Sequence, residues 1–228
     1  MAINDPTGYY WEWEENIRMR PWLQPFIFYK IINVVEIFSS NPFLWTLILR
    51  IISSILGFIS IILLYFTFKD IFFYKNKIFN TFLFFTFWFY PFIHSRTSSE
   101  NISITLFIIS FCILYKSLFT NTFKLNFKTI SLASFLMGIS MVVKFTTVFS
   151  ALPFFLWMLI YKYHFKRIFL FSLFVFIALC LGLYIDYLNW GTFKNTYYQF
   201  YHHNLSSGVT GRMKYFGVEP WYYYFIEI

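Results

Sequence analysis

Long apolar stretches rich in Phe, Ile and Leu alternate with short polar stretches along most of this sequence. The apolar stretches are continuous, and most approach the roughly 20 residues that a helix needs to cross the hydrocarbon core of a bilayer. The strands of a membrane β-barrel would instead alternate apolar and polar residues. The pattern therefore predicts an all-α multi-pass membrane protein with about six membrane segments.

The predicted membrane helices share a continuous apolar character. They are expected at Pro42–Phe68, Ile78–Ile93, Asn101–Phe119, Thr129–Lys144, Thr146–Ile160 and Ile168–Tyr187. Thr146–Ile160 is short for a full crossing, so we expect it to be tilted or to span only part of the membrane. The preceding stretch Pro21–Ser40 places Trp22, Tyr29 and two charges among apolar residues. This composition favours an amphipathic helix in the membrane interface.

These elements predict a single domain over residues 1–228, with three parts. Residues 1–41 form an outer loop and the interfacial helix, residues 42–187 form the membrane helices, and residues 188–228 form an aromatic loop on the outer face. No signal peptide is visible in Met1–Tyr10, which lacks both a basic region and an apolar region. The two ends resemble internal positions of a membrane protein, and we expect the chain to be part of a longer one.

The polar stretches are of two kinds, which differ in charge. Three of them, at residues 69–77, 116–128 and 161–167, contain nine of the 18 Lys and Arg residues, with Asp70 as the only acid. The other nine acids lie in or beside the remaining polar stretches. Basic loops remain on the cytoplasmic side of membranes. We therefore expect the N-terminal segment and the residues after Asp186 on the periplasmic or lumenal side.

Composition supports the same class of protein. Only 12% of the residues are charged, about half the fraction of a soluble domain. The net charge of +8 follows from the basic loops, so we expect membrane lipids and no nucleic acid as partners. Cys112 and Cys180 lie within apolar stretches and are expected to be small buried residues rather than a disulfide or a metal pair.

The first stretch with candidate chemistry interleaves aromatic and charged residues between Trp11 and Pro21. Its candidate binding residues are Trp11, Glu12, Trp13, Arg18 and Arg20. A Trp ring can stack on a sugar, while carboxylate and guanidinium groups bond its hydroxyls in defined directions. An interfacial belt of Trp and Arg would give the same composition. The two interpretations have equal weight on composition alone.

Two further candidates lie at helix ends. Arg96 suits a phosphate, because its guanidinium fork matches phosphate oxygens. The alternative is an ion pair of Arg96 with Glu100, with Ser98 or Ser99 capping the next helix. Lys144 is an isolated cation at the end of an apolar stretch, where charges are costly and often functional. Its alternative role is to extend its ammonium group to the interface.

The C-terminal stretch is rich in aromatic residues and His. Its candidates for lining a carbohydrate or lipid-phosphate site are His202, His203, Asn204, Trp221 and Tyr223. Adjacent His residues on a helix point about 100° apart, so we expect no metal site there. The sequence contains no phosphate-binding glycine loop, HExxH or GxSxG motif, which argues against P-loop ATPases, zinc proteases and serine hydrolases.

Four of these stretches occur in the order known from one enzyme family. Trp11–Trp13 and Ile17–Pro21 resemble its "tWEW…iRs…P" stretch, and Ser95–Glu100 resembles its "sRt.s…E" loop. Gly138–Lys144 resembles its span with Gly and a later Arg or Lys, and Asp186–Tyr224 resembles its loop ending in "PWhwYf". The family is that of the polyprenyl-phosphate-mannose-dependent mannosyltransferases, glycosyltransferase family 22, with the GT-C superfold.

The resemblance implies a GT-C-like helical bundle that transfers a hexose with inversion. The donor would be a polyprenyl- or dolichyl-phosphate sugar held by Arg96 and Lys144, and the acceptor a glycan or glycolipid. The family's presumed base belongs to an Asp-containing motif upstream of this sequence, and Asp5 does not match it. We therefore assign no catalytic residue and expect this chain alone to be inactive or strongly impaired. No cofactor is assigned, and a divalent cation is compatible with the chemistry.

Other classes remain open. Enzymes that use other polyprenyl-linked sugars, such as lipid A aminoarabinose or protein O-mannosyl enzymes, share the outer helix, but the WEW and PWYYY strings favour the mannosyltransferases. A transporter or flippase would place polar groups near the bilayer midplane, whereas here they collect at one surface. A non-catalytic membrane subunit is the third class. The sequence is compatible with either a bacterial inner membrane or the ER membrane.

Overall fold

The computed structural model describes residues 20–72, 77–86, 93–119, 127–160, 165–193 and 195–202, and every regular element in these ranges is helical. The elements are α1 (Leu23–Glu36), α2 (Pro42–Phe72), α3 (Lys77–Thr86), α5 (Ser99–Phe119), α6 (Phe127–Val143), the 3₁₀ turn η2 (Phe145–Thr147), α7 (Val148–Ile160), α8 (Phe165–Trp190) and α9 (Thr196–Tyr201). The prediction of an all-α protein is confirmed for the described ranges.

The chain divides into two compact units. One comprises Trp22–Ile185 and holds α1 to α7 with most of α8. The other comprises Met1–Pro21 and Asp186–Ile228. Its described residues include the last turn of α8, the turn that follows, and α9.

Within the described residues, three helices are long and apolar enough to cross a membrane. The candidate spans within α2, α5 and α8 are Pro42–Lys69, Ser99–Lys116 and Phe165–Trp190. The apolar helix α6 has 17 residues, and α7 has 13 and contains Pro153. At 1.5 Å per residue, α7 is about 20 Å long. This length agrees with the expectation of a short segment there, and the total number of crossings stays a prediction.

The helix bounds agree with the predicted ones to within a few residues at most ends. Asn41 begins α2, because its side-chain Oδ1 accepts a hydrogen bond of 3.0 Å from Phe43 N, and Pro42 suits the first helical position. The interfacial helix is shorter than predicted, since α1 covers Leu23–Glu36. The helix predicted at Ile78–Ile93 is described as far as Thr86, and residues 87–92 lie outside the described residues.

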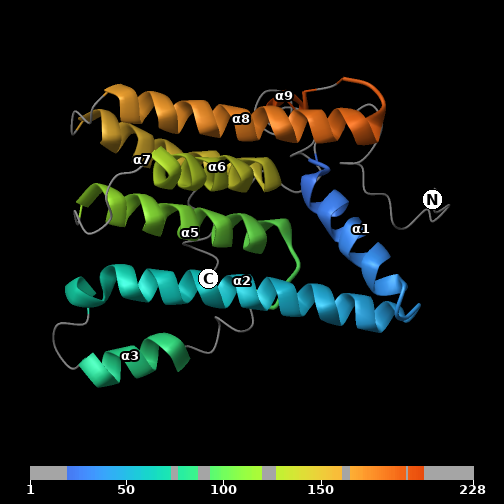
Figure 1. The fold of residues 1–228 in the computed structure, drawn as a ribbon, viewed down its shortest axis with the longest axis horizontal. Helices are drawn as coiled ribbons and strands as arrows, with labels where there is room; N and C mark the ends of the chain where they lie inside the picture. The colour runs from blue at the N-terminus through green and yellow to red at the C-terminus, as the bar shows by residue number, and fades with distance from the viewer. Residues whose placement is uncertain are drawn as a thin grey trace, which may run out of the picture. The chain divides into compact units, whose positions relative to one another are not determined.

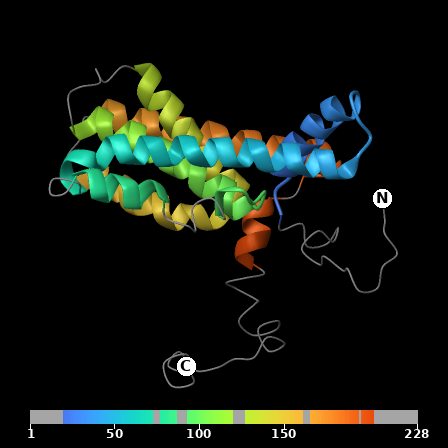
Figure 2. The ribbon, with the colours of Figure 1, turned by 90° about the horizontal axis from the view of Figure 1, so that it is seen from below.

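The first helix, α1, is inclined to the other helices and lies at one end of the bundle (Figures 1 and 2). It packs against α2 and α6, and its Leu23 is buried. Ile27, Tyr29 and Val34 are exposed on α1. Exposed apolar and aromatic side chains on an inclined helix suit lipid contact. The position of α1 in the membrane interface stays a prediction.

Hydroxyl groups join α5 to α6. Ser103 Oγ donates a hydrogen bond of 2.7 Å to Ser140 O, and Ser110 Oγ donates one of 2.6 Å to Ala133 O. All four residues are buried. The pairing of rising numbers in α5 with falling numbers in α6 shows that the two helices are antiparallel. Small side chains bring the backbones close, which is typical of helix packing in lipid.

The apolar core of the larger unit surrounds α6. Its buried residues are Leu114, Ala133, Met137, Met141, Ala151, Phe154, Met158 and Phe171. Gly138, which also belongs to α6, lies against α8. A Cβ at Gly138 would lie 2.5 Å from Ala178 Cβ and 2.9 Å from Val175 O. Only glycine therefore permits this approach of α6 to α8 without displacement of one helix.

The directions of the helices separate two groups of charges in the larger unit. In Figure 1, α2 and α5 run in the same direction and α6 runs in the opposite one. Lys69 near the end of α2, Lys116 near the end of α5 and Lys128 at the start of α6 therefore lie at one end of the bundle. Glu100 at the start of α5 and Lys144 after α6 lie at the other end. The bundle itself separates these two groups, as the alternation of loops predicts.

Gly138→Ala is expected to destabilise the protein by about 1–3 kcal/mol, because the added methyl group overlaps Ala178 and the backbone of Val175. Thermal unfolding of the purified protein should show a lower Tm. Adding Ala178→Gly removes one of the overlapping atoms and should recover part of the loss. An unchanged Tm for Gly138→Ala would contradict the close contact of α6 with α8.

Candidate functional site

The turn before α5 is shaped by the side chain of Asn101. Its Nδ2 donates hydrogen bonds to His94 O (3.3 Å) and Arg96 O (2.7 Å), and its Oδ1 lies 3.1 Å from His94 Nδ1. Because the amide nitrogen faces two carbonyls, the amide oxygen faces the ring, and His94 Nδ1 must carry the proton. Ser98 Oγ accepts a hydrogen bond of 3.3 Å from Asn101 N, so Ser98 caps the helix. The backbone of Arg96 is thereby fixed.

Two other helices attach this turn to the bundle. Gln24 of α1 donates a hydrogen bond of 2.7 Å from Nε2 to Thr97 O. On α2, Gly57 lies directly against the side chain of His94, and a Cβ at Gly57 would overlap the imidazole ring. The turn therefore contacts α1 and α2, and its shape depends on both of these helices as well as on α5.

His94 is 7% exposed, and burial lowers its pKa. The hydrogen bond with Asn101 acts in the opposite direction but is the smaller effect. Burial in a medium of low polarity favours the neutral form of an imidazole. His94 is therefore a neutral structural residue near neutral pH rather than a cation for an anionic substrate.

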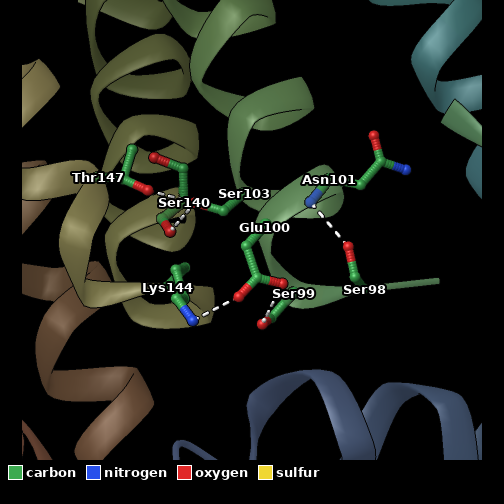
Figure 3. A network of polar contacts seen from close by, with 8 residues as sticks. All are labelled: Ser98, Ser99, Glu100, Asn101, Ser103, Ser140, Lys144 and Thr147. Atoms are coloured by element: carbon green, nitrogen blue, oxygen red, sulfur yellow. Dashed lines mark hydrogen bonds and ion pairs between the residues drawn. The ribbon is translucent and has the colours of Figure 1, made fainter. Parts of the chain in front are cut away.

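An ion pair joins the start of α5 to the end of α6 (Figure 3). Lys144 Nζ lies 2.5 Å from Glu100 Oε1, and Ser99 Oγ donates a hydrogen bond of 3.3 Å to Glu100 Oε2. The side chain of Lys144 is 17% exposed, whereas that of Glu100 is 60% exposed. Lys144 is isolated from other charges in the sequence, but in the structure it is paired with Glu100, which is distant in sequence. Arg96, the partner considered for Glu100, is exposed in the preceding turn.

Lys144 occupies a break between α6 and η2. Its backbone is extended, with φ −145° and ψ 109°, so the helix cannot continue through it. Lys144 N still donates to Ser140 O (3.1 Å), and Lys144 O accepts from Thr147 N (3.0 Å). Ser103 of α5 contacts both Ser140 O and the hydroxyl of Thr147 (Figure 3). The break is therefore supported from the neighbouring helix.

In the smaller unit, a buried carboxylate fixes the start of α9. Thr196 Oγ1 donates a hydrogen bond of 2.6 Å to Asp186 Oδ2, and both residues are almost fully buried. Gly191 follows α8 with φ +71°, a conformation that favours glycine, and its N–H bonds Tyr187 O at 2.9 Å. Asn195 caps α9 through a bond of 3.1 Å from Tyr198 N. Hydrogen bonds between residues that are close in sequence thus hold the turn between α8 and α9.

The predicted site residues fall into three groups. Glu100 and Lys144 are in contact, and Arg96 lies in the turn that precedes Glu100. Arg20 and His202 belong to the smaller unit, where the rings of His202 and Tyr198 lie 5.9 Å apart. The others lie outside the described residues: Trp11, Glu12, Trp13, Arg18, His203, Asn204, Trp221 and Tyr223.

Two supporting groups were not predicted from the sequence. One is Asn101 with His94, Gly57 and Gln24, and the other is Asp186 with Thr196. A glycine within a long apolar stretch was the available signal for the first, because it permits a close neighbour. An acid inside an apolar stretch was the signal for the second. Neither signal shows which distant residue the glycine or the acid will contact.

Lys144 and, nearby in sequence, Arg96 are the cationic groups of this site. A lysine ammonium group attracts phosphate as a point charge, and Arg96 offers a fork of donors nearby in sequence. Among the described residues, no group of three or more His, Cys, Asp or Glu side chains is arranged to hold a metal ion.

Comparison with known proteins places the chemistry of this site in context. The sequence matches the model of the Alg9-like mannosyltransferase family over residues 6–228. No curated protein and no solved structure gives a significant match.

Neutral His94 makes the stability of the protein depend on pH. The unfolded chain binds a proton below about pH 6.5, whereas the folded chain binds it only at lower pH. The contribution of His94 is therefore complete above pH 6.5 and is lost as the pH falls towards the folded pKa. The Tm of the natural protein should fall more between about pH 7.5 and pH 5 than that of His94→Gln. Equal losses of Tm would contradict this linkage.

Thr196→Val removes the hydroxyl that bonds the buried carboxylate of Asp186. A buried polar acceptor that loses its donor costs about 1–3 kcal/mol. Amide hydrogen exchange in α9 should accelerate by about fivefold or more, because α9 opens more easily. Thr196→Ser keeps the hydroxyl and should exchange at nearly the natural rate. Identical exchange in the two variants would show that this bond does not hold α9.

Proposed function

The chain belongs to the Alg9-like mannosyltransferase family, and from this premise we propose that it transfers mannose or another hexose from a polyprenyl-phosphate sugar to a lipid-linked or glycan acceptor. Membership supports a membrane glycosyltransferase, as do the long apolar helices. The identity of the donor, the identity of the acceptor and the membrane face of the site are proposed here in addition to the family.

The ion pair of Lys144 and Glu100 is the observation that carries the proposal. A lipid phosphate needs a cation close to the membrane surface, and Lys144 directly follows the apolar helix α6, most of whose residues are buried. The mostly buried ammonium group attracts a phosphate more strongly than an exposed lysine does, because less water screens it. Arg96, fixed at its backbone by Asn101, adds a second cation.

The chemistry that follows is an inverting displacement. The acceptor hydroxyl attacks the anomeric carbon, the bond from that carbon to the phosphate oxygen breaks, and the lipid phosphate leaves with its charge. Lys144 and Arg96 stabilise the developing charge on the phosphate. The base that takes the hydroxyl proton is not assigned to a residue of this chain.

The separation of charges supports the orientation. Lys69, Lys116 and Lys128 lie at the end of the bundle opposite the ion pair. Basic residues favour the cytoplasmic side. The proposal therefore puts the site on the periplasmic or lumenal side of a bacterial inner membrane or an ER membrane, where polyprenyl-phosphate sugars serve as donors.

Arg96→Ala should weaken use of the lipid donor, because one charge-assisted contact to the phosphate is lost. A loss of about 1.5–3 kcal/mol corresponds to about 10- to 150-fold in kcat/KM for the donor. The measurement is transfer of radiolabelled mannose from polyprenyl phosphate to glycolipids in membranes that contain the protein. Binding of polyprenyl phosphate to the purified chain in nanodiscs gives a readout that does not require a catalytic base.

Lys128→Ala is the matched control, because Lys128 is an exposed cation at the opposite end of the bundle. It should leave both transfer and binding unchanged. Equal effects of the two substitutions would remove the phosphate role of Arg96. Movement of the lipid across the membrane without sugar transfer would favour a flippase and contradict the proposal.

A further inference from the structure

The two members of the ion pair differ in their freedom to move. The side chain of Lys144 is 17% exposed and that of Glu100 is 60% exposed, although their charged atoms are only 2.5 Å apart. A side chain that is largely enclosed keeps its position, whereas an exposed one can turn into solvent. Glu100 is therefore the residue of the pair whose side chain can move away from the other.

The backbone of Lys144 is held independently of Glu100. Hydrogen bonds to Ser140 and Thr147 fix both peptide groups of Lys144, and Ser103 fixes Ser140 and Thr147 in turn. Removal of the carboxylate would leave these contacts in place. The ammonium group would then remain directed at the space that Glu100 had filled (Figure 3).

Glu100 also has a favourable position without Lys144. It lies in the first turn of α5, two residues after the capping residue Ser98, and Ser99 contacts its second oxygen. A carboxylate in the first turn of a helix is stabilised by the helix dipole. Because the side chain of Glu100 is exposed, water can replace Lys144 as a partner of its carboxylate when the two residues separate. For the enclosed Lys144, however, the loss of every counter-ion is costly.

We infer that Glu100 is a positioning residue that neutralises Lys144 while the site is empty and is displaced when the phosphate of the lipid donor binds. This inference rests on the proposed function, since it assigns the incoming anion to that donor. The site exchanges one anion for another, so Lys144 is never enclosed without a counter-ion. Glu100 weakens donor binding by competition and prevents other anions from occupying the site.

The test measures binding of polyprenyl phosphate, without sugar, to the full chain in nanodiscs. Glu100→Gln removes the competing charge but keeps the shape, and should bind the lipid about 3- to 10-fold more tightly. It should also bind inorganic phosphate, which the natural protein excludes. Lys144→Gln should bind polyprenyl phosphate at least about 10-fold more weakly, and the double variant should bind as weakly as Lys144→Gln alone.

Glu100→Asp provides a second variant if Glu100→Gln folds poorly. The shorter carboxylate reaches Lys144 less well, so lipid binding should lie between that of the natural protein and that expected for Glu100→Gln. If Lys144→Gln loses binding while both Glu100 variants bind no more tightly than the natural protein, the exchange is wrong and the phosphate role of Lys144 stands. If Lys144→Gln binds normally, the phosphate role in the proposed function is itself wrong.

Discussion

The helix break at Lys144 depends on hydroxyl groups that α5 supplies. In a lipid environment, backbone polar groups need partners within the protein, because no water is available to them. The extended conformation of Lys144 interrupts the hydrogen bonds of α6, and Ser103 bonds Ser140 O and contacts Thr147 beside the interruption. The chain can therefore stop one helix and begin the next within a few residues, in an otherwise apolar region.

That requirement determines how the neighbouring helices pack. A serine reaches a carbonyl of another helix only when the two backbones are close, and Ser110 repeats the contact of Ser103 further along α5. Gly138 then allows α8 to approach α6 on another side. The close contact of α5 with α6 brings Glu100 to Lys144. The ion pair is thus a consequence of helix packing that begins with small and hydroxyl-bearing residues.

Local features of the structure could be predicted from the sequence, and contacts between distant residues could not. Continuous apolar stretches gave the helices, and Ser98 was one of two predicted caps for α5, which the structure confirms. These features depend on neighbours in sequence. The partner of Lys144 is 44 residues away, and the ring of His94 packs on a glycine of another helix. A single sequence contains the residue types for such contacts but not the register that pairs them.

Both units hold a turn beside a helix end in place by the same kind of contact. In each, a buried polar side chain at a helix end bonds residues of the adjoining turn: Asn101 holds the carbonyl of Arg96, and Asp186 holds Thr196 at the start of α9. A side chain on a fixed backbone loses less conformational entropy when it binds a ligand. The backbone of an exposed candidate such as Arg96 therefore depends on a buried residue of the same unit. Substitutions at Asn101 or Asp186 should be judged first by the position of the turns that these residues hold.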